Sequence, residues 1–100
     1  MIRHVVMWKF KEEGEGKSKA ENMQIVTERL YALPPVISQL KKMEIIADIS
    51  HTEMSMDLML LTEFESVEAM KEYAVHPEHV KVSQYVRKVI ESRVVLDAEI

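Results

Sequence analysis

The chain has 100 residues and a formal net charge of −4, enough for one small domain, which we expect to span residues 1–100. Hydrophobic residues make up 47% and charged residues 30%, which excludes a disordered chain, and no apolar run approaches the roughly 20 residues of a membrane span. The acidic balance argues against nucleic acid as a partner, and the lack of cysteine excludes disulfides and thiolate chemistry, which suits the cytoplasm.

The segment from Ile2 to Phe10 has the alternation of a β-strand. Basic residues interrupt it and no small-residue cleavage site follows, so we interpret it as a strand rather than a signal peptide. One face of this strand carries Ile2, His4, Val6, Trp8 and Phe10, and the other carries Arg3, Val5, Met7 and Lys9.

A helix is predicted after the polar loop of residues 11–17. Ser18 and Glu21 match a capping box, in which each side chain accepts a hydrogen bond from the backbone N–H of the other residue. Pro34-Pro35 ends this helix because proline has no N–H to donate. Apolar residues recur between these limits at steps of three and four, which predicts a buried stripe of Met23, Val26, Leu30 and Leu33.

The second half of the chain repeats the alternation of strands and helices. Strands are predicted over residues 43–49 and 56–64, joined by the polar connection 50–55. Ser66 then caps a helix, and Pro77 starts another at its first position, where a missing N–H costs nothing. The inner sides of these two helices are predicted to carry Val67, Met70 and Ala74, and then Val82, Val86, Val89 and Ile90.

The last predicted element is a strand over residues 93–97. The order is therefore strand, helix, strand, strand, broken helix, strand. With right-handed crossovers and one hairpin, this order gives an α+β fold: a four-stranded antiparallel sheet with the helices on one face. The sequence thus predicts the ferredoxin-like βαββαβ arrangement.

The second face of this sheet should be polar if it faced water, but it is not. Charged residues, Arg93 and Asp97 among them, alternate with apolar ones only toward the strand ends. Because monomers rarely expose so much contiguous apolar surface, we expect a homodimer in which two sheets face each other. The predicted interface consists of Val5, Met7, Ile46, Met59, Leu61 and Val95.

Three stretches of the chain carry a resemblance to a known family. Glu63-Phe64-Glu65-Ser66 leading to Tyr73-x-x-His76-Pro77-x-His79-x-x-Val82 resembles the stress-responsive dimeric α/β-barrel family, the Dabb domain. The opening strand and the closing Arg93-Val94-Val95-Leu96-Asp97 fit it as well, so the resemblance covers essentially the whole chain.

The resemblance implies a ferredoxin-like subunit and a barrel that two sheets form across a dimer interface. It also implies a stress association. Polyketide-cyclase members of the family work without a cofactor and use a tyrosine and a histidine as acid and base, which correspond to Tyr73 and His79 here, with His4 as a pocket histidine. This chain departs from the pattern in the connection 50–55, which lacks the glycine that many members carry, so the rim of the pocket is expected to differ.

The candidate site lies between the sheet and the helices. His4 shares a strand face with Trp8, and Tyr73, His76 and His79 follow each other at helical spacing, so their side chains can converge there. A histidine can exchange a proton near neutral pH, and a tyrosine can stabilise an oxyanion. We therefore predict Tyr73 and His79 as catalytic residues and His4, Trp8 and His76 as ligand-binding residues.

Each of these residues also has a purely structural interpretation. His76 precedes Pro77 and is well placed to cap the new helix, and His79 or His4 can be buried histidines bonded to the backbone or to neighbouring side chains. Trp8 and the methionines suit the core and the interface. No metal is expected, since Pro77 disrupts the spacing of His76 and His79, and no cofactor is expected either.

Three functions remain open from the sequence. The first is a dimeric, stress-associated protein that binds a small, partly apolar ligand, and we favour it. The second is a cofactor-independent enzyme for proton transfer or aldol-type closure, with His79 as base and Tyr73 as acid. The third is a structural module whose dimer face is its purpose. A cavity of roughly 300 Å³ or more beside His4, Tyr73 and His79 would favour the first two.

Overall fold

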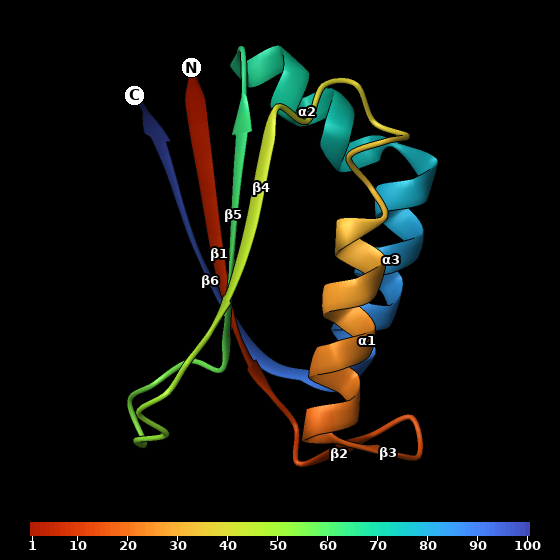
Figure 1. Ribbon diagram of the computed structural model, residues 1–100, viewed down its shortest axis with the longest axis vertical. Coiled ribbons are helices and arrows are strands. Elements are labelled where there is room, and N and C mark those ends of the chain that lie inside the picture. The colour runs from red at the N-terminus through yellow and green to blue at the C-terminus, as the bar shows by residue number, and fades with distance from the viewer.

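The computed structural model describes residues 1–100 and has a four-stranded sheet with three helices on one face (Figure 1). Its strands run antiparallel in the order β4-β5-β1-β6, which confirms the predicted ferredoxin-like arrangement. The sheet consists of β1 (Ile2–Phe10), β4 (Lys42–Ala47), β5 (Leu58–Phe64) and β6 (Ile90–Glu99). The helices are α1 (Lys19–Tyr31), α2 (Val67–Val75) and α3 (Pro77–Val89).

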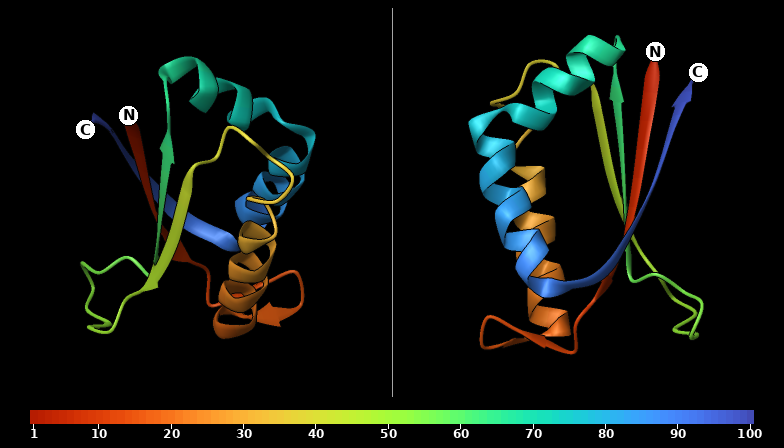
Figure 2. Two further views of the ribbon diagram at one scale, coloured as in Figure 1. Left: turned by 45° about the horizontal axis from the view of Figure 1, so that its top comes forward. Right: turned by 180° about the vertical axis from the view of Figure 1, so that it is seen from behind.

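Two of the helices run along the sheet and the third crosses its end. Figure 2 shows α1 and α3 side by side against the same sheet face, whereas α2 lies at the end of the sheet where both termini emerge. The termini are bonded to each other, since the backbone N–H of Ile100 donates to the carbonyl of Met1 at 2.9 Å. No helix of the structure is long and apolar enough to cross a membrane.

The helices begin where the sequence predicts. Ser18 Oγ accepts from the N–H of Glu21 at 3.2 Å, and the Glu21 carboxylate accepts from the N–H of Ser18 at 3.1 Å, so the capping box is complete. Ser66 Oγ caps α2 through the N–H of Ala69 at 3.1 Å. Pro77 is the first residue of α3, which confirms its predicted position.

Several predicted boundaries shift. The loop 11–17 contains a small hairpin of β2 (Glu13–Gly14) and β3 (Lys17–Ser18), whose two turn residues, Glu15 and Gly16, both have positive φ, as a tight hairpin turn requires. The predicted strands shorten to β4 and β5, so the connection between them lengthens to residues 48–57.

The register of β6 contradicts the predicted position of one interface residue, Val95. Val95 lies opposite Val6 and therefore on the helix-facing side, while Val94 and Leu96 lie opposite Met7 and Val5 on the outer side. The cause is a β-bulge near the start of the strand, where the pairing shifts between Lys9 and Phe10 and one extra residue reverses the alternation. The same register moves Arg93 and Asp97 from the outer to the helix-facing side.

The core lies between the sheet and the helices, as the alternation of β1 predicts. One detail of α2 differs from the prediction, since Val67 and Ala74 are exposed and Tyr73 is the buried residue. Because α2 crosses the sheet end, it turns the Tyr73 ring onto Phe64, at 5.0 Å between ring centroids. The most fully buried apolar side chains are Val6, Phe10, Val26, Leu30, Ile37, Phe64 and Val89.

A buried asparagine, which the sequence pattern does not single out, joins the β2–β3 hairpin to both long helices. Asn22 of α1 is fully buried, and its Nδ2 donates to the carbonyl of Gly14 at 3.0 Å. Its Oδ1 accepts from the hydroxyl of Tyr85 on α3 at 2.6 Å. These bonds satisfy the amide inside the core and fix α1 relative to α3.

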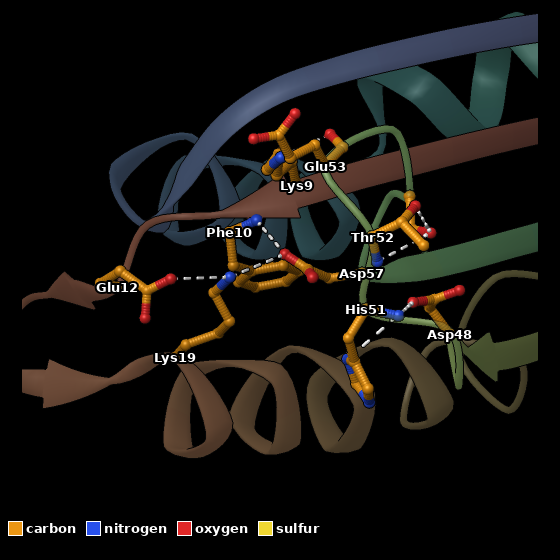
Figure 3. Close-up of polar contacts among 10 residues, drawn as sticks. Lys9, Phe10, Glu12, Lys19, Asp48, His51, Thr52, Glu53 and Asp57 are labelled. Carbon is orange, nitrogen blue, oxygen red and sulfur yellow. Dashed lines mark hydrogen bonds and ion pairs between the residues drawn. The ribbon is translucent and has the colours of Figure 1, made fainter.

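Charged contacts hold the opposite end of the sheet (Figure 3). The Asp57 carboxylate accepts from the N–H of Phe10 at 2.7 Å and lies 3.4 Å from Lys19 Nζ at the start of α1. In the connection 48–57, the Asp48 carboxylate accepts from the N–H of His51 at 2.7 Å, which supports the positive φ of His51. His51 is thus an exposed loop residue, remote from the candidate site.

The outer face of the sheet is uncovered by the chain itself. Met7 and Met59 lie opposite each other at its centre, with Ile46 opposite Met59 on the next strand. Leu96 is 65% exposed, far more than a leucine in a core. With the register correction, the apolar residues of this face are Val5, Met7, Ile46, Met59, Leu61, Val94 and Leu96, which we call the outer apolar face.

Candidate functional site

A cavity of about 370 Å³ lies between the sheet and α3. Four of the predicted site residues line it: His4 and Trp8 from β1, Tyr73 from α2 and His79 from α3. Most of the remaining wall is aliphatic, so a ligand here would meet a small number of polar groups in an apolar enclosure.

Two residues of the wall have buried polar atoms without a hydrogen-bond partner. They are the hydroxyl of Tyr73 and the indole N–H of Trp8. A buried donor without a partner costs free energy, so such groups are rare in folded proteins. Burial raises the pKa of the Tyr73 hydroxyl well above its ordinary value, so the tyrosine is protonated and able to donate at neutral pH.

His79 is held in one orientation beside Tyr73. Its Nδ1 lies 3.0 Å from the carbonyl of Ala74, and since a carbonyl can only accept, Nδ1 carries the proton. Burial lowers the pKa of His79, with a further contribution from the positive charge of Arg93. The ring is therefore neutral at pH 7, with Nε2 as a free acceptor, and its centroid lies 4.3 Å from that of Tyr73.

His4 is oriented by a residue that the sequence does not single out. Its Nδ1 bonds the carboxylate of Asp97, which lies directly opposite on β6. Since a carboxylate accepts, Nδ1 of His4 is the donor and Nε2 is the atom left for other partners. This contact depends on the register of β6 and so has no signal in the sequence.

His76, the remaining predicted ligand-binding residue, does not line the cavity. Its Nδ1 accepts from the N–H of Glu78 at 3.1 Å and so caps α3. The reason is local: a histidine just before Pro77 is within reach of the free N–H groups of the new helix. The predicted capping role of His76 is therefore confirmed.

Two arginines that sequence reasoning missed line the cavity. Arg87 comes from the last turn of α3, and its Nη2 donates to Ser83 Oγ at 3.3 Å, a second cavity residue. Arg93 comes from β6, opposite Trp8. Helical spacing from His79 through Ser83 to Arg87 was the signal that could have identified Arg87, whereas Arg93 reaches this side only through the bulge.

The chain shows no group of three or more histidine, aspartate or glutamate side chains arranged to hold a metal ion. The side chains of the cavity wall offer two imidazoles, a protonated phenol, an indole N–H and two guanidinium groups.

Comparisons with known proteins agree with this architecture. The family model of the stress responsive A/B barrel domain matches residues 2–100. A dimeric protein of unknown function with a ferredoxin-like fold from Bacteroides fragilis is 28% identical, with a TM-score of 0.82 over 99% of this chain and 95% of that one. A protein from Arabidopsis thaliana is 25% identical, with a TM-score of 0.81 over 99% and 94%.

A more distant structure shares the fold alone. The hydroxynitrile lyase from Passiflora edulis is 16% identical, with a TM-score of 0.81 over 97% of this chain and 90% of that one. The comparison with curated proteins gave no match.

Proposed function

This chain belongs to the stress responsive A/B barrel family, and we propose that it is a homodimer that binds a small, partly apolar ligand in the cavity between sheet and helices. The observation that carries the proposal is the pair of unpartnered buried donors, Tyr73 OH and Trp8 Nε1, in the wall of a cavity of about 370 Å³. A ligand with a carbonyl or similar acceptor would supply a missing partner. We keep the cytoplasm as the expected compartment of this cysteine-free chain.

The outer apolar face supports the homodimer. Two copies that meet through this face would bury Met59 and its neighbours, which one chain leaves uncovered. The similar protein from Bacteroides fragilis is described as dimeric, which adds support from a relative of 28% identity. The cavity lies on the other side of the sheet, so each subunit would carry its own ligand site.

Tyr73→Phe tests the ligand proposal. Because the Tyr73 hydroxyl is buried without a partner, removing it should leave the free energy of unfolding unchanged or raise it by about 1 kcal/mol. Affinity for a carbonyl compound should fall about tenfold, the value of one good hydrogen bond. Trp8 is the single tryptophan and lines the cavity, so a fluorescence titration with benzylacetone measures binding, and urea unfolding measures stability.

Tyr31→Phe is the matched control, since the Tyr31 hydroxyl accepts from the N–H of Ile45 at 3.1 Å and lies outside the cavity. It should cost up to about 1 kcal/mol of stability and leave binding unchanged. A Tyr73→Phe variant that is clearly less stable than the parent, with unaltered affinity, would contradict the assignment of this hydroxyl to a ligand.

A second candidate function is a cofactor-independent enzyme that moves a proton on a carbonyl compound. The observation in its favour is the pair of protonation states, a neutral His79 beside a protonated Tyr73. His79 Nε2 would remove a proton from the carbon next to the carbonyl, and the Tyr73 hydroxyl would donate a hydrogen bond to the resulting enolate oxygen. No other group is needed for this step.

His79→Ala tests the enzymatic function. Exchange of the α-protons of benzylacetone for deuterium, followed by NMR, should slow by about 10²–10⁴-fold, the usual contribution of a general base. Since His79 acts when neutral and its pKa lies below 6.5, the parent rate should rise with pH below that value and level off at neutral pH. His51→Ala, in the exposed connection, should leave the exchange rate unchanged, and an equal rate in His79→Ala would exclude His79 as the base.

A further inference from the structure

The charge of the cavity wall differs from that of the whole chain. The chain has 17 aspartate and glutamate residues against 13 lysine and arginine residues. The cavity is lined by two arginines and two histidines and by no acidic residue. An acidic protein therefore encloses a cavity whose charged side chains are all of the opposite sign, which favours an anion inside it.

Neither cavity arginine has a carboxylate partner within the chain. Arg87 donates only to the neutral hydroxyl of Ser83, and Arg93 makes no ion pair. The carboxylate of Asp97, on the same strand and side as Arg93, is engaged with His4. The two guanidinium groups thus keep their donors for something outside the protein.

Structural roles account for only one of these two charges. Arg87 lies in the last turn of α3, where a cation offsets the negative end of the helix dipole, and Lys88 beside it does the same. Arg93 lies on a strand and has no such role. It lines the cavity beside Trp8 of the neighbouring strand, and its positive charge contributes to the lowered pKa of His79.

The position of the two arginines also indicates how a ligand would lie. Both are exposed, so they stand where the cavity meets solvent, whereas Trp8 and Tyr73 are buried in its wall. A charged group near the arginines keeps part of its hydration, and an apolar body can then extend along the aliphatic and aromatic wall. A cavity of about 370 Å³ suits a compact body such as one ring with a short chain.

We propose that the natural ligand of this cavity is a small organic carboxylate, an apolar or aromatic body whose carboxylate is bound by Arg87 and Arg93. The inference rests on the proposed ligand-binding function and specifies its ligand class. A singly charged carboxylate fits better than a phosphate ester, because both arginines lie at or beyond the negative C-terminal end of α3 and no glycine-rich loop lines the site. Guanidinium groups bind carboxylates with paired, charge-assisted hydrogen bonds.

The test compares acids with their uncharged amides of the same shape. Phenylacetate, hydrocinnamate and phenylbutyrate, each beside its amide, are titrated into the full chain while the fluorescence of Trp8 is followed. At least one acid should bind about tenfold or more tightly than its amide, and added salt should weaken the acid alone.

The variant Arg87→Gln with Arg93→Gln should reduce the affinity for the acid about tenfold and leave the amide unchanged. The matched control, Lys81→Gln with Lys88→Gln, removes two positive charges from exposed positions of α3 that do not line the cavity and should change neither affinity. This control separates contact with the ligand from the net charge of the protein.

The possible failures are distinguishable. If acids and amides bind equally, or the arginine variant binds the acid as the parent does, the cavity binds ligands but the carboxylate assignment is wrong. If none of the six compounds alters Trp8 fluorescence or raises the unfolding temperature, both this inference and the proposed ligand-binding function are overturned.

Discussion

Replacing Met59 with glutamate will convert the proposed dimer into monomers. Met59 lies on β5 at the centre of the outer apolar face, directly between Met7 on β1 and Ile46 on β4. In a two-fold dimer, the substitution places two carboxylates in the middle of an apolar contact that offers no partner. Burying an unpaired charge costs several kcal/mol, so a loss of about 4 kcal/mol would raise the dissociation constant about a thousandfold.

Light scattering at micromolar concentration measures the outcome. The parent should have twice the 11.6 kDa mass of one chain, and the variant should have that of one chain. Because the dimer favours the uncharged carboxyl group, its pKa rises on association, and part of the dimer should return as the pH is lowered.

Val36→Glu introduces the same side chain at an exposed position of the connection after α1, away from the outer face, and should remain dimeric. A parent chain that scatters as a monomer would remove the proposed dimer. A Met59→Glu variant that stays dimeric at neutral pH would place the interface elsewhere on the molecule.

Replacing Asn22 with alanine will cost about 3 kcal/mol of folding stability. The change leaves the carbonyl of Gly14 and the hydroxyl of Tyr85 without their partner and opens a small void in a fully buried position. Since Asn22 connects the β2–β3 hairpin, α1 and α3, the loss should also loosen the helix that forms one wall of the cavity.

Urea unfolding at a fixed protein concentration measures this cost, because the stability of a dimer depends on concentration. Gln24→Ala removes an amide from the same helix whose bond is to exposed Glu28, and it should stay within about 0.5 kcal/mol of the parent. Tyr85→Phe removes one of the bonds to Asn22, and its stability should lie between those of Asn22→Ala and Gln24→Ala. Equal stability of Asn22→Ala and Gln24→Ala would show that the buried amide contributes little.

The local features of this fold could be predicted because they depend on residues close together in the sequence. The capping box of Ser18 and Glu21, the cap at Ser66 and the helix start at Pro77 each involve bonds or backbone restrictions within three or four residues. The alternation of β1 assigned its two faces correctly, because both sides of a strand are fixed once one residue is placed.

The candidate site could be predicted only in part. His4, Trp8, Tyr73 and His79 do lie in the wall of one cavity, and their spacing within β1 and around α3 was the reason to group them. The same spacing grouped His76 with them, but its ring accepts a local hydrogen bond from the N–H of Glu78 and caps α3 instead. The spacing of residues along a helix predicts which side chains are close together, but a competing hydrogen bond to the backbone decides where a side chain such as His76 points.

The order of strands and helices, the start of each helix and the apolar outer face of the sheet could all be derived from the amino-acid pattern, since they follow from local bonds and side-chain alternation. The side of β6 that faces the helices depends on its pairing with β1, because both sides carry valine or leucine and one bulged residue reverses them. That reversal brings Arg93 and Asp97 to the cavity side and Val94 and Leu96 to the outer face. The contributions of Arg93 and Asp97 to the site therefore rest on long-range pairing, which no short stretch of sequence encodes.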